Sequence, residues 1–127
     1  MTRRYYVDKS RHMDKNTAIK AFSALAQDRR LEVFRLLVRS APEGLAAGEI
    51  ARRLTVPHNT LSSHLSILKN ARLIASVRHG RSVVYSADFQ GMGDLIAFLL
   101  QDCCQGRPEA CAPLNGLLLN GGGDSPL

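Results

Sequence analysis

The chain between residues 58 and 70 carries leucines at helical spacing. Leu61, Leu65 and Leu68 recur at intervals of four and three residues, which predicts a helix with one buried face. The opposite face holds short polar groups and one lysine but no acidic residue: His58, Asn59, Ser62, Ser63, Ser66 and Lys69. A solvated surface helix more often alternates Glu with Lys, so this face is expected to contact something other than water.

The segments that flank this helix predict a compact supersecondary unit. A short helix is expected over Ala46–Leu54, and Pro57 suits the first turn of the next helix, so the two helices are joined by a tight turn. After residue 73 the period shortens to two, which predicts strands over Ala75–Arg78 and Ser82–Ser86 with a turn at His79–Arg81. A helix-turn-helix followed by a two-stranded ribbon is a winged helix.

Three further helices complete the predicted fold. One begins at Asp14, the second is expected to be capped by Asp28, and the last covers Gly91–Cys104. Pro42 and Gly44 end the second helix. The chain is therefore predicted to be mainly α with a small β-hairpin, in the order of four helices, two strands and a final helix. The expected apolar stripes are Ala18, Phe22, Leu25 and Ala26 in the first helix, Leu31, Phe34, Leu37 and Val38 in the second, and Met92, Leu95, Ile96, Leu99 and Leu100 in the last.

The length of 127 residues predicts one domain. Residues 1–12 are interpreted as a flexible arm, with Met13 as an alternative native start that would make them an added leader. Residues 13–104 are expected to form the domain, and residues 105–127 a loop with a mobile tail. The broad apolar stripe of the last helix predicts that it pairs with its mate in a homodimer.

Charge and polar patterning together indicate double-stranded DNA as the partner. The net charge of +6 is a modest sign of a polyanionic ligand. Amide, hydroxyl and imidazole groups can meet base edges closely in the major groove, while basic residues at a wing contact the backbone. The predicted DNA-contacting residues are His58, Asn59, Thr60, Ser62, Ser63 and His64 on the helix and Arg78 and Arg81 on the ribbon.

The location of the protein is predicted from what the chain lacks. There is no run of 18 apolar residues and no secretory signal at the N-terminus, so a cytoplasmic protein without membrane contact is expected. The three cysteines, Cys103, Cys104 and Cys111, are then expected to be thiols rather than a disulfide framework.

Two interpretations fit these thiols. Cys103 continues an apolar stripe and could be a small buried hydrophobe. Alternatively, a helix that ends near Cys104 lets a short loop bring Cys111 to the other two, and three thiolates suit As(III) or Sb(III) better than four-coordinate zinc. The clustering of three thiols favours the second interpretation. His58 and His64 are six positions apart, which is the wrong spacing for one helical metal pair.

Three segments resemble the ArsR/SmtB family of dimeric winged-helix metal-responsive repressors. They are ALAQDRRLEVFRLLV at residues 24–38, TLSSHLSILKNARLI at residues 60–74 and RHGRSVVYS at residues 78–86. The resemblance implies operator binding in the metal-free state and release when an inducer binds.

The resemblance also bears on the inducer. Ala46 and Gly48 stand where the best-known arsenic sensor has cysteines, and the last helix lacks the histidine that zinc-sensing members use. Cys103, Cys104 and Cys111 look like the branch that carries its thiolates at the end of the last helix. A neighbouring branch senses methylated trivalent arsenicals with an adjacent cysteine pair only, so the third thiol favours inorganic As(III) or Sb(III).

Other functions remain as alternatives. Within the same fold, a methylarsenite, Cd(II)/Pb(II) or thiol-oxidation sensor fits the cysteines. A small arsenate or thiol reductase is disfavoured, because the sequence has no phosphate-binding loop, no Cys-X-X-Cys motif and no acid–base pair near the thiols. A pure interaction module is disfavoured by the polar helix face. The chain is thus predicted to be no enzyme and to use no organic cofactor.

Overall fold

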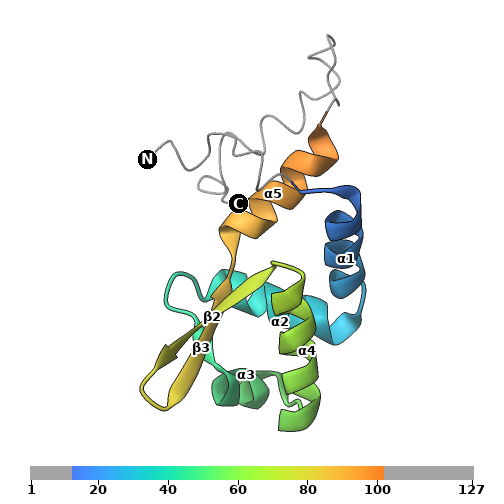
Figure 1. Ribbon diagram of the computed structural model, residues 1–127. Helices are drawn as coiled ribbons and strands as arrows, with labels where there is room; N and C mark the ends of the chain where they lie inside the picture. Colours follow the sequence, from blue (N-terminus) through green and yellow to red (C-terminus); the bar gives the residue numbers. More distant parts are fainter. Residues whose placement is uncertain (1–12, 102–127) are drawn as a thin grey trace, which may run out of the picture. The chain divides into compact units, whose positions relative to one another are not determined.

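The computed structural model describes residues 13–101 (Figure 1). The predictions for residues 1–12 and for Cys103, Cys104 and Cys111 lie outside this range. The described elements are α1 Lys15–Leu25, α2 Asp28–Arg39, β1 Leu45–Ala46, α3 Ala47–Leu54, α4 His58–Asn70, β2 Ile74–His79, β3 Ser82–Ala87 and α5 Phe89–Leu100. The chain divides into two compact units, the first ending at Leu95 and the second beginning at Ile96, of which only the end of α5 is described.

Side-chain caps set where the first two helices begin. The carboxylate of Asp14 accepts a hydrogen bond from the Thr17 N–H at 2.8 Å, as a residue at this position should. In α2 the cap is Gln27, whose side-chain oxygen accepts from the Arg30 N–H at 2.9 Å. The prediction that Asp28 caps this helix is therefore wrong by one residue. Asp28 is the first helical residue, where its charge still favours the positive end of the helix.

The buried faces of α1 and α2 match the predicted stripes in part, because Ala18, Phe34 and Leu37 are buried as predicted. In α1 the buried residues are Ala18, Ala21 and Ala24, while Phe22 is 39% exposed. The prediction missed Ala21 and Ala24, whose small side chains let α1 lie close to α2 and α4. The prediction also placed Leu31 of α2 in the core, although this residue is exposed. The buried residues of α2 are Val33, Phe34, Leu36 and Leu37.

The hairpin is longer than predicted and belongs to a three-stranded sheet. β2 and β3 pair antiparallel from Ile74 with Ala87 to His79 with Ser82, so His79 is in a strand. Gly80 has a left-handed φ of 63° in the remaining two-residue turn. β1, which was not predicted, pairs with β3 on its other side. Two residues are too short to show a period, but the mainly α fold with an antiparallel hairpin is confirmed.

The core fixes the recognition unit formed by α3 and α4. Leu61 and Leu68 of α4 and Ile50 of α3 are fully buried, and α3 and α4 pack against each other and against α2. Thr55, in the left-handed region at φ 53°, ends α3. The predicted helix-turn-helix is present, and its inward leucines are the ones that the pattern predicted. Figure 1 shows α3 beside α4 and the hairpin projecting beyond the helices.

The last helix begins earlier than predicted. It starts at Phe89 rather than Gly91, because the Asp88 carboxylate accepts a hydrogen bond from the Gly91 N–H at 2.9 Å. Of the predicted stripe only Leu95 is buried, and Leu99 is 56% exposed. None of the helices in residues 13–101 has the length and apolar character needed to cross a membrane.

Candidate nucleic-acid interface

The outward face of α4 is exposed and mainly polar, with Ile67, which is 41% exposed, as its apolar side chain. Five of its six predicted DNA-contacting residues are exposed, and so are two polar neighbours on the same helix: His58, Asn59, Thr60, Ser62, Ser63, Ser66 and Lys69. The opposite face carries the buried leucines. The structure therefore brings together on one helix face five of the six α4 side chains that were predicted to contact DNA.

The beginning of α4 has few internal partners for its N–H groups. Pro57 occupies the cap position and makes no side-chain hydrogen bond, and the first turn contains no acidic residue. Asn59 accepts a hydrogen bond from the Thr60 N–H at 2.9 Å. The positive end of the helix dipole is thus exposed beside the polar face, which favours approach to a phosphate backbone.

His64 differs from the other predicted residues of α4. It is half-buried, and its Nδ1 atom is enclosed without a hydrogen-bond partner among the described residues. Burial lowers the pKa of His64, and the positive charges of Arg30 and Arg29 lower it further. Both arginines belong to α2. The Arg30 Nε–H donates to the Ala24 carbonyl of α1 at 2.7 Å, and the Arg29 guanidinium pairs with Glu32 of α2 at 2.7 Å. His64 therefore lies towards α2, where burial and the two arginines disfavour its charged form.

The hairpin presents its basic residues at its tip. Arg78 and Arg81 are exposed, as is His79 between them in the sequence. Arg78 pairs with Val83 one step from the end of the hairpin, where His79 pairs with Ser82. Two exposed cations at the end of a ribbon are suited to backbone or minor-groove contacts.

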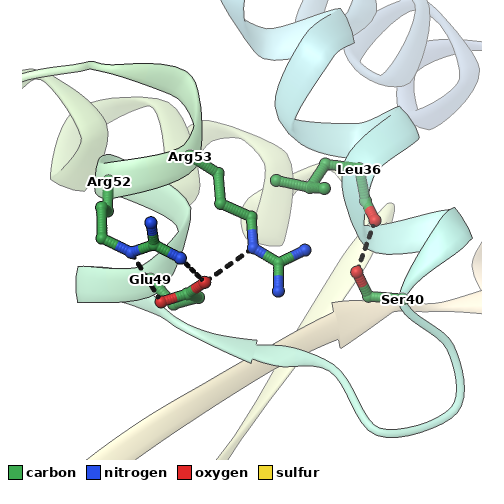
Figure 2. A network of polar contacts seen from close by, with 5 residues as sticks. All are labelled: Leu36, Ser40, Glu49, Arg52 and Arg53. Atoms are coloured by element: carbon green, nitrogen blue, oxygen red, sulfur yellow. Dashed lines mark hydrogen bonds and ion pairs between the residues drawn. The ribbon is translucent and has the colours of Figure 1, made fainter.

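The charges of α3 are largely engaged with each other (Figure 2). The Glu49 carboxylate binds the guanidinium groups of both Arg52 and Arg53, the latter at 2.7 Å. These hydrogen bonds lower the pKa of Glu49 to about 2. Two cations sharing one anion leave a net charge of +1, so we expect α3 to attract DNA less than the hairpin tip does. The spacing of three and four residues in the sequence is the signal that could have predicted this network.

A second polar contact in Figure 2 ends α2. The Ser40 hydroxyl donates to the Leu36 carbonyl at 2.9 Å, and the Ser40 N–H donates to the same carbonyl at 3.0 Å. These bonds satisfy a carbonyl that the end of a helix would otherwise leave free. The chain can therefore turn towards β1 and α3 directly after α2.

No metal site is formed by the part of the chain that the structure describes. Within residues 13–101, no three His, Cys, Asp or Glu side chains come together in a set that could hold an ion. The predicted metal ligands Cys103, Cys104 and Cys111 lie outside the described residues.

Comparisons with known proteins identify the same kind of unit. Residues 25–77 match the helix-turn-helix domain family. The HTH-type transcriptional regulator Rv2034 of Mycobacterium tuberculosis is 38% identical over 76 residues, which cover 60% of this chain and 68% of that protein.

Two solved structures resemble the fold. An ArsR-like transcriptional regulator from Rhodococcus sp. RHA1 superposes with a TM-score of 0.62 and 25% identity, covering 79% of this chain and 91% of that one. The homodimeric winged helix-turn-helix DNA-binding domain of Mb0332 from Mycobacterium bovis, a possible ArsR-family regulator, has a TM-score of 0.54 and 25% identity over 68% and 80% of the two chains.

Proposed function

The chain belongs to the ArsR/SmtB family of winged-helix transcriptional regulators, and from this premise we propose that it is a repressor that binds palindromic operator DNA as a homodimer. The observation that carries the proposal is the acid-free polar face of α4 beside an exposed helix N-terminus. In the bound state α4 lies in the major groove. Asn59, Ser62 and Ser63 meet base edges there, and the hairpin arginines contact the backbone.

The homodimer is supported by apolar side chains that the described residues leave uncovered. On α1, Ile19 is 54% exposed and Phe22 lies one turn further along the same helix. Phe89 and Leu99 of α5 are also exposed. A single exposed apolar residue is ordinary, but Ile19 and Phe22 lie one turn apart on one helix, and an isologous contact between two copies would bury them in both copies.

Binding to a selected duplex tests the DNA-contacting residues. The wild-type protein is used to enrich a preferred duplex from a random library, and Asn59→Ala and Arg81→Ala are compared on it. We expect Asn59→Ala to lose about 1–3 kcal/mol of binding free energy on that duplex and to relax its sequence preference. Arg81→Ala should weaken binding to every duplex and reduce the slope of log K against log salt by about 0.9 per lost phosphate contact.

Arg39→Ala is the matched control, because Arg39 is an exposed cation at the end of α2. It should leave both the preferred sequence and the salt slope unchanged. Equal losses for Arg39→Ala and Arg81→Ala would mean that only net charge matters, and would contradict the assignment of the hairpin.

The proposed inducer is As(III) or Sb(III), held by Cys103, Cys104 and Cys111, which lie outside the described residues. Two observations support this proposal: α5 ends at Leu100, three residues before Cys103, and three thiols within nine residues suit a soft three-coordinate ion. Capture of the ion at the end of α5 would lower operator affinity. A coupling of about 1–3 kcal/mol is typical of allosteric proteins, which corresponds to a decrease of roughly 5- to 150-fold.

Thiol counting tests the ligand set. One arsenite per protomer should protect three thiols of the reduced wild-type protein from alkylation, and Cys103→Ser, Cys104→Ser and Cys111→Ser should each weaken arsenite binding. Protection of only Cys103 and Cys104, with methylarsenite preferred, would select the methylarsenite sensor. Tighter binding of Cd(II) or Pb(II) than of arsenite would select a sensor of those ions. Loss of DNA binding on oxidation alone would select the redox sensor.

A further inference from the structure

The C-terminal cap of α4 is built around an arginine in a conformation that favours glycine. The Leu73 N–H donates to the Leu68 carbonyl at 3.1 Å, and the Arg72 N–H donates to the Lys69 carbonyl at 3.0 Å. This pair of bonds is a Schellman motif, whose left-handed position usually holds Gly. Here it holds Arg72 at φ 64°. A residue that keeps an unfavourable backbone angle is expected to be held there by its surroundings.

The beginning of α5 supplies those surroundings. The Asp88 N–H donates to the Leu73 carbonyl at 2.9 Å. A Cβ atom placed on Gly91 would lie only 1.8 Å from the Arg72 carbonyl oxygen, so the backbones of α5 and of the α4 cap are in direct contact. The Arg72 guanidinium also forms an ion pair with the Asp94 carboxylate, and both side chains are partly buried.

Asp94 is itself held in place by its own helix. Its second oxygen accepts a hydrogen bond from the Gln90 side-chain amide at 3.2 Å, so both oxygens of the carboxylate are engaged. Arg72 thus meets α5 on two sides: its carbonyl lies close to Gly91, and its side chain pairs with Asp94. We refer to Arg72, Leu73, Asp88, Gly91 and Asp94 as the α4–α5 clamp.

We propose that Arg72 and Asp94 are positioning residues for DNA recognition, which fix the orientation in which α4 presents its polar face. Neither residue lies on that face. The clamp ties the end of the recognition helix to the first two turns of α5, so a change in the position of those turns must either move α4 or break the ion pair. This inference rests on the proposed DNA binding. With the proposed inducer, the same contacts would pass a displacement of α5 to α4.

A double-mutant cycle on the reduced, arsenite-free protein tests the clamp. The variants are Asp94→Asn, Arg72→Gly and the double variant, measured on the duplex enriched by the wild type and on a random duplex of equal length. Arg72→Gly removes the ion pair while giving the cap the residue that its backbone angle favours, so it should remain folded. The control is Glu32→Gln, which breaks the Arg29–Glu32 ion pair inside α2 but does not remove the hydrogen bond from Arg29 to the Leu54 carbonyl of α3.

Each single variant should weaken binding to the enriched duplex by about 3- to 30-fold and leave binding to the random duplex unchanged. The double variant should bind the enriched duplex no more weakly than the single variant that has the lower affinity. Glu32→Gln should bind as the wild type does. Full retention of selective binding, or an equal loss on both duplexes, would overturn the proposal. Failure of arsenite to release the wild type would instead contradict the inducer and leave this result standing.

Amide hydrogen exchange without DNA gives a second measurement. Asp94→Asn should accelerate exchange in the last turn of α4 and the first turns of α5 together, while the amides of α3 keep their wild-type rates. If the exchange rates changed in α5 alone, the ion pair would not hold the α4 cap. This result would also overturn the proposal.

Discussion

At the scale of single residues, the polar groups of the recognition unit divide into accessible and enclosed ones. His58 and Asn59 are exposed at the beginning of α4, whereas the Nδ1 atom of His64 is enclosed next to α2. The enclosed His64 also differs from the exposed residues in its electrostatic surroundings, because the neighbouring cations Arg30 and Arg29 oppose its protonation. His64 is therefore better suited to holding α4 on α2 than to contacting an anion.

This difference predicts a pH dependence of stability. The pKa of His64 is lower in the folded state than its ordinary value of 6.5, so the unfolded chain binds the proton more readily. Stability from this group is fully present above about pH 6.5 and is lost as the pH falls through the folded-state pKa. The melting temperature should decrease between pH 7 and pH 5, and His64→Gln should flatten this dependence.

His58→Gln is the matched control for this measurement, because His58 is exposed at the start of the same helix. It should retain the wild-type pH dependence. An equal flattening in both variants would mean that the dependence does not originate at His64.

Gly91 gives a second prediction for a single side chain. Gly91→Ala would place a methyl group against the Arg72 carbonyl and should lower the free energy of unfolding by about 1–3 kcal/mol or more. At roughly 4–8 °C per kcal/mol, thermal unfolding would detect this loss readily. Gly93→Ala is the control, since a Cβ there meets nothing within 4 Å, and it should stabilise α5 by up to about 1 kcal/mol. Equal stability of the two variants would contradict the close contact.

At the scale of elements, the sequence predicted the helices and strands that a hydrophobic period reveals, but not the features that depend on contacts between residues far apart in the chain. The leucines of α4 and the alternation of β2 and β3 are local signals, so the recognition helix and the hairpin were correctly predicted. β1 has two residues and exists because β3 pairs with it. Residues 72 and 94 are far apart in the sequence, so nothing local predicts their ion pair. The face of α1 was misjudged because alanines at the right spacing, rather than larger residues, form its contacts.

At the scale of the whole molecule, the proposed activity requires two copies of the chain. A palindromic operator presents two half-sites, and each is read by one recognition helix. The hydrophobic surface that would join the copies includes Ile19 of α1, while the neighbouring Lys20 is an exposed polar residue on the same helix. Oligomeric state and DNA binding should therefore change together when that surface is altered.

Ile19→Glu tests this link. The dimer loses the buried side chain twice, at about 1.5–3 kcal/mol for each copy, so sedimentation equilibrium should show a large shift towards monomer and operator affinity should fall with it. Lys20→Glu should remain dimeric. A dimer that survives Ile19→Glu unchanged would place the contact elsewhere.

We propose that a soft ion bound by three thiolates releases the repressor from DNA. The most direct measurement is a fluorescence-anisotropy titration of the reduced protein with its enriched duplex, with and without arsenite, for the wild type and for Cys111→Ser. The proposal predicts that arsenite lowers wild-type affinity roughly 5- to 150-fold and that Cys111→Ser binds the duplex normally but is no longer released. Wild-type affinity that stays constant while arsenite binds tightly, or equal release of the two proteins, would contradict it.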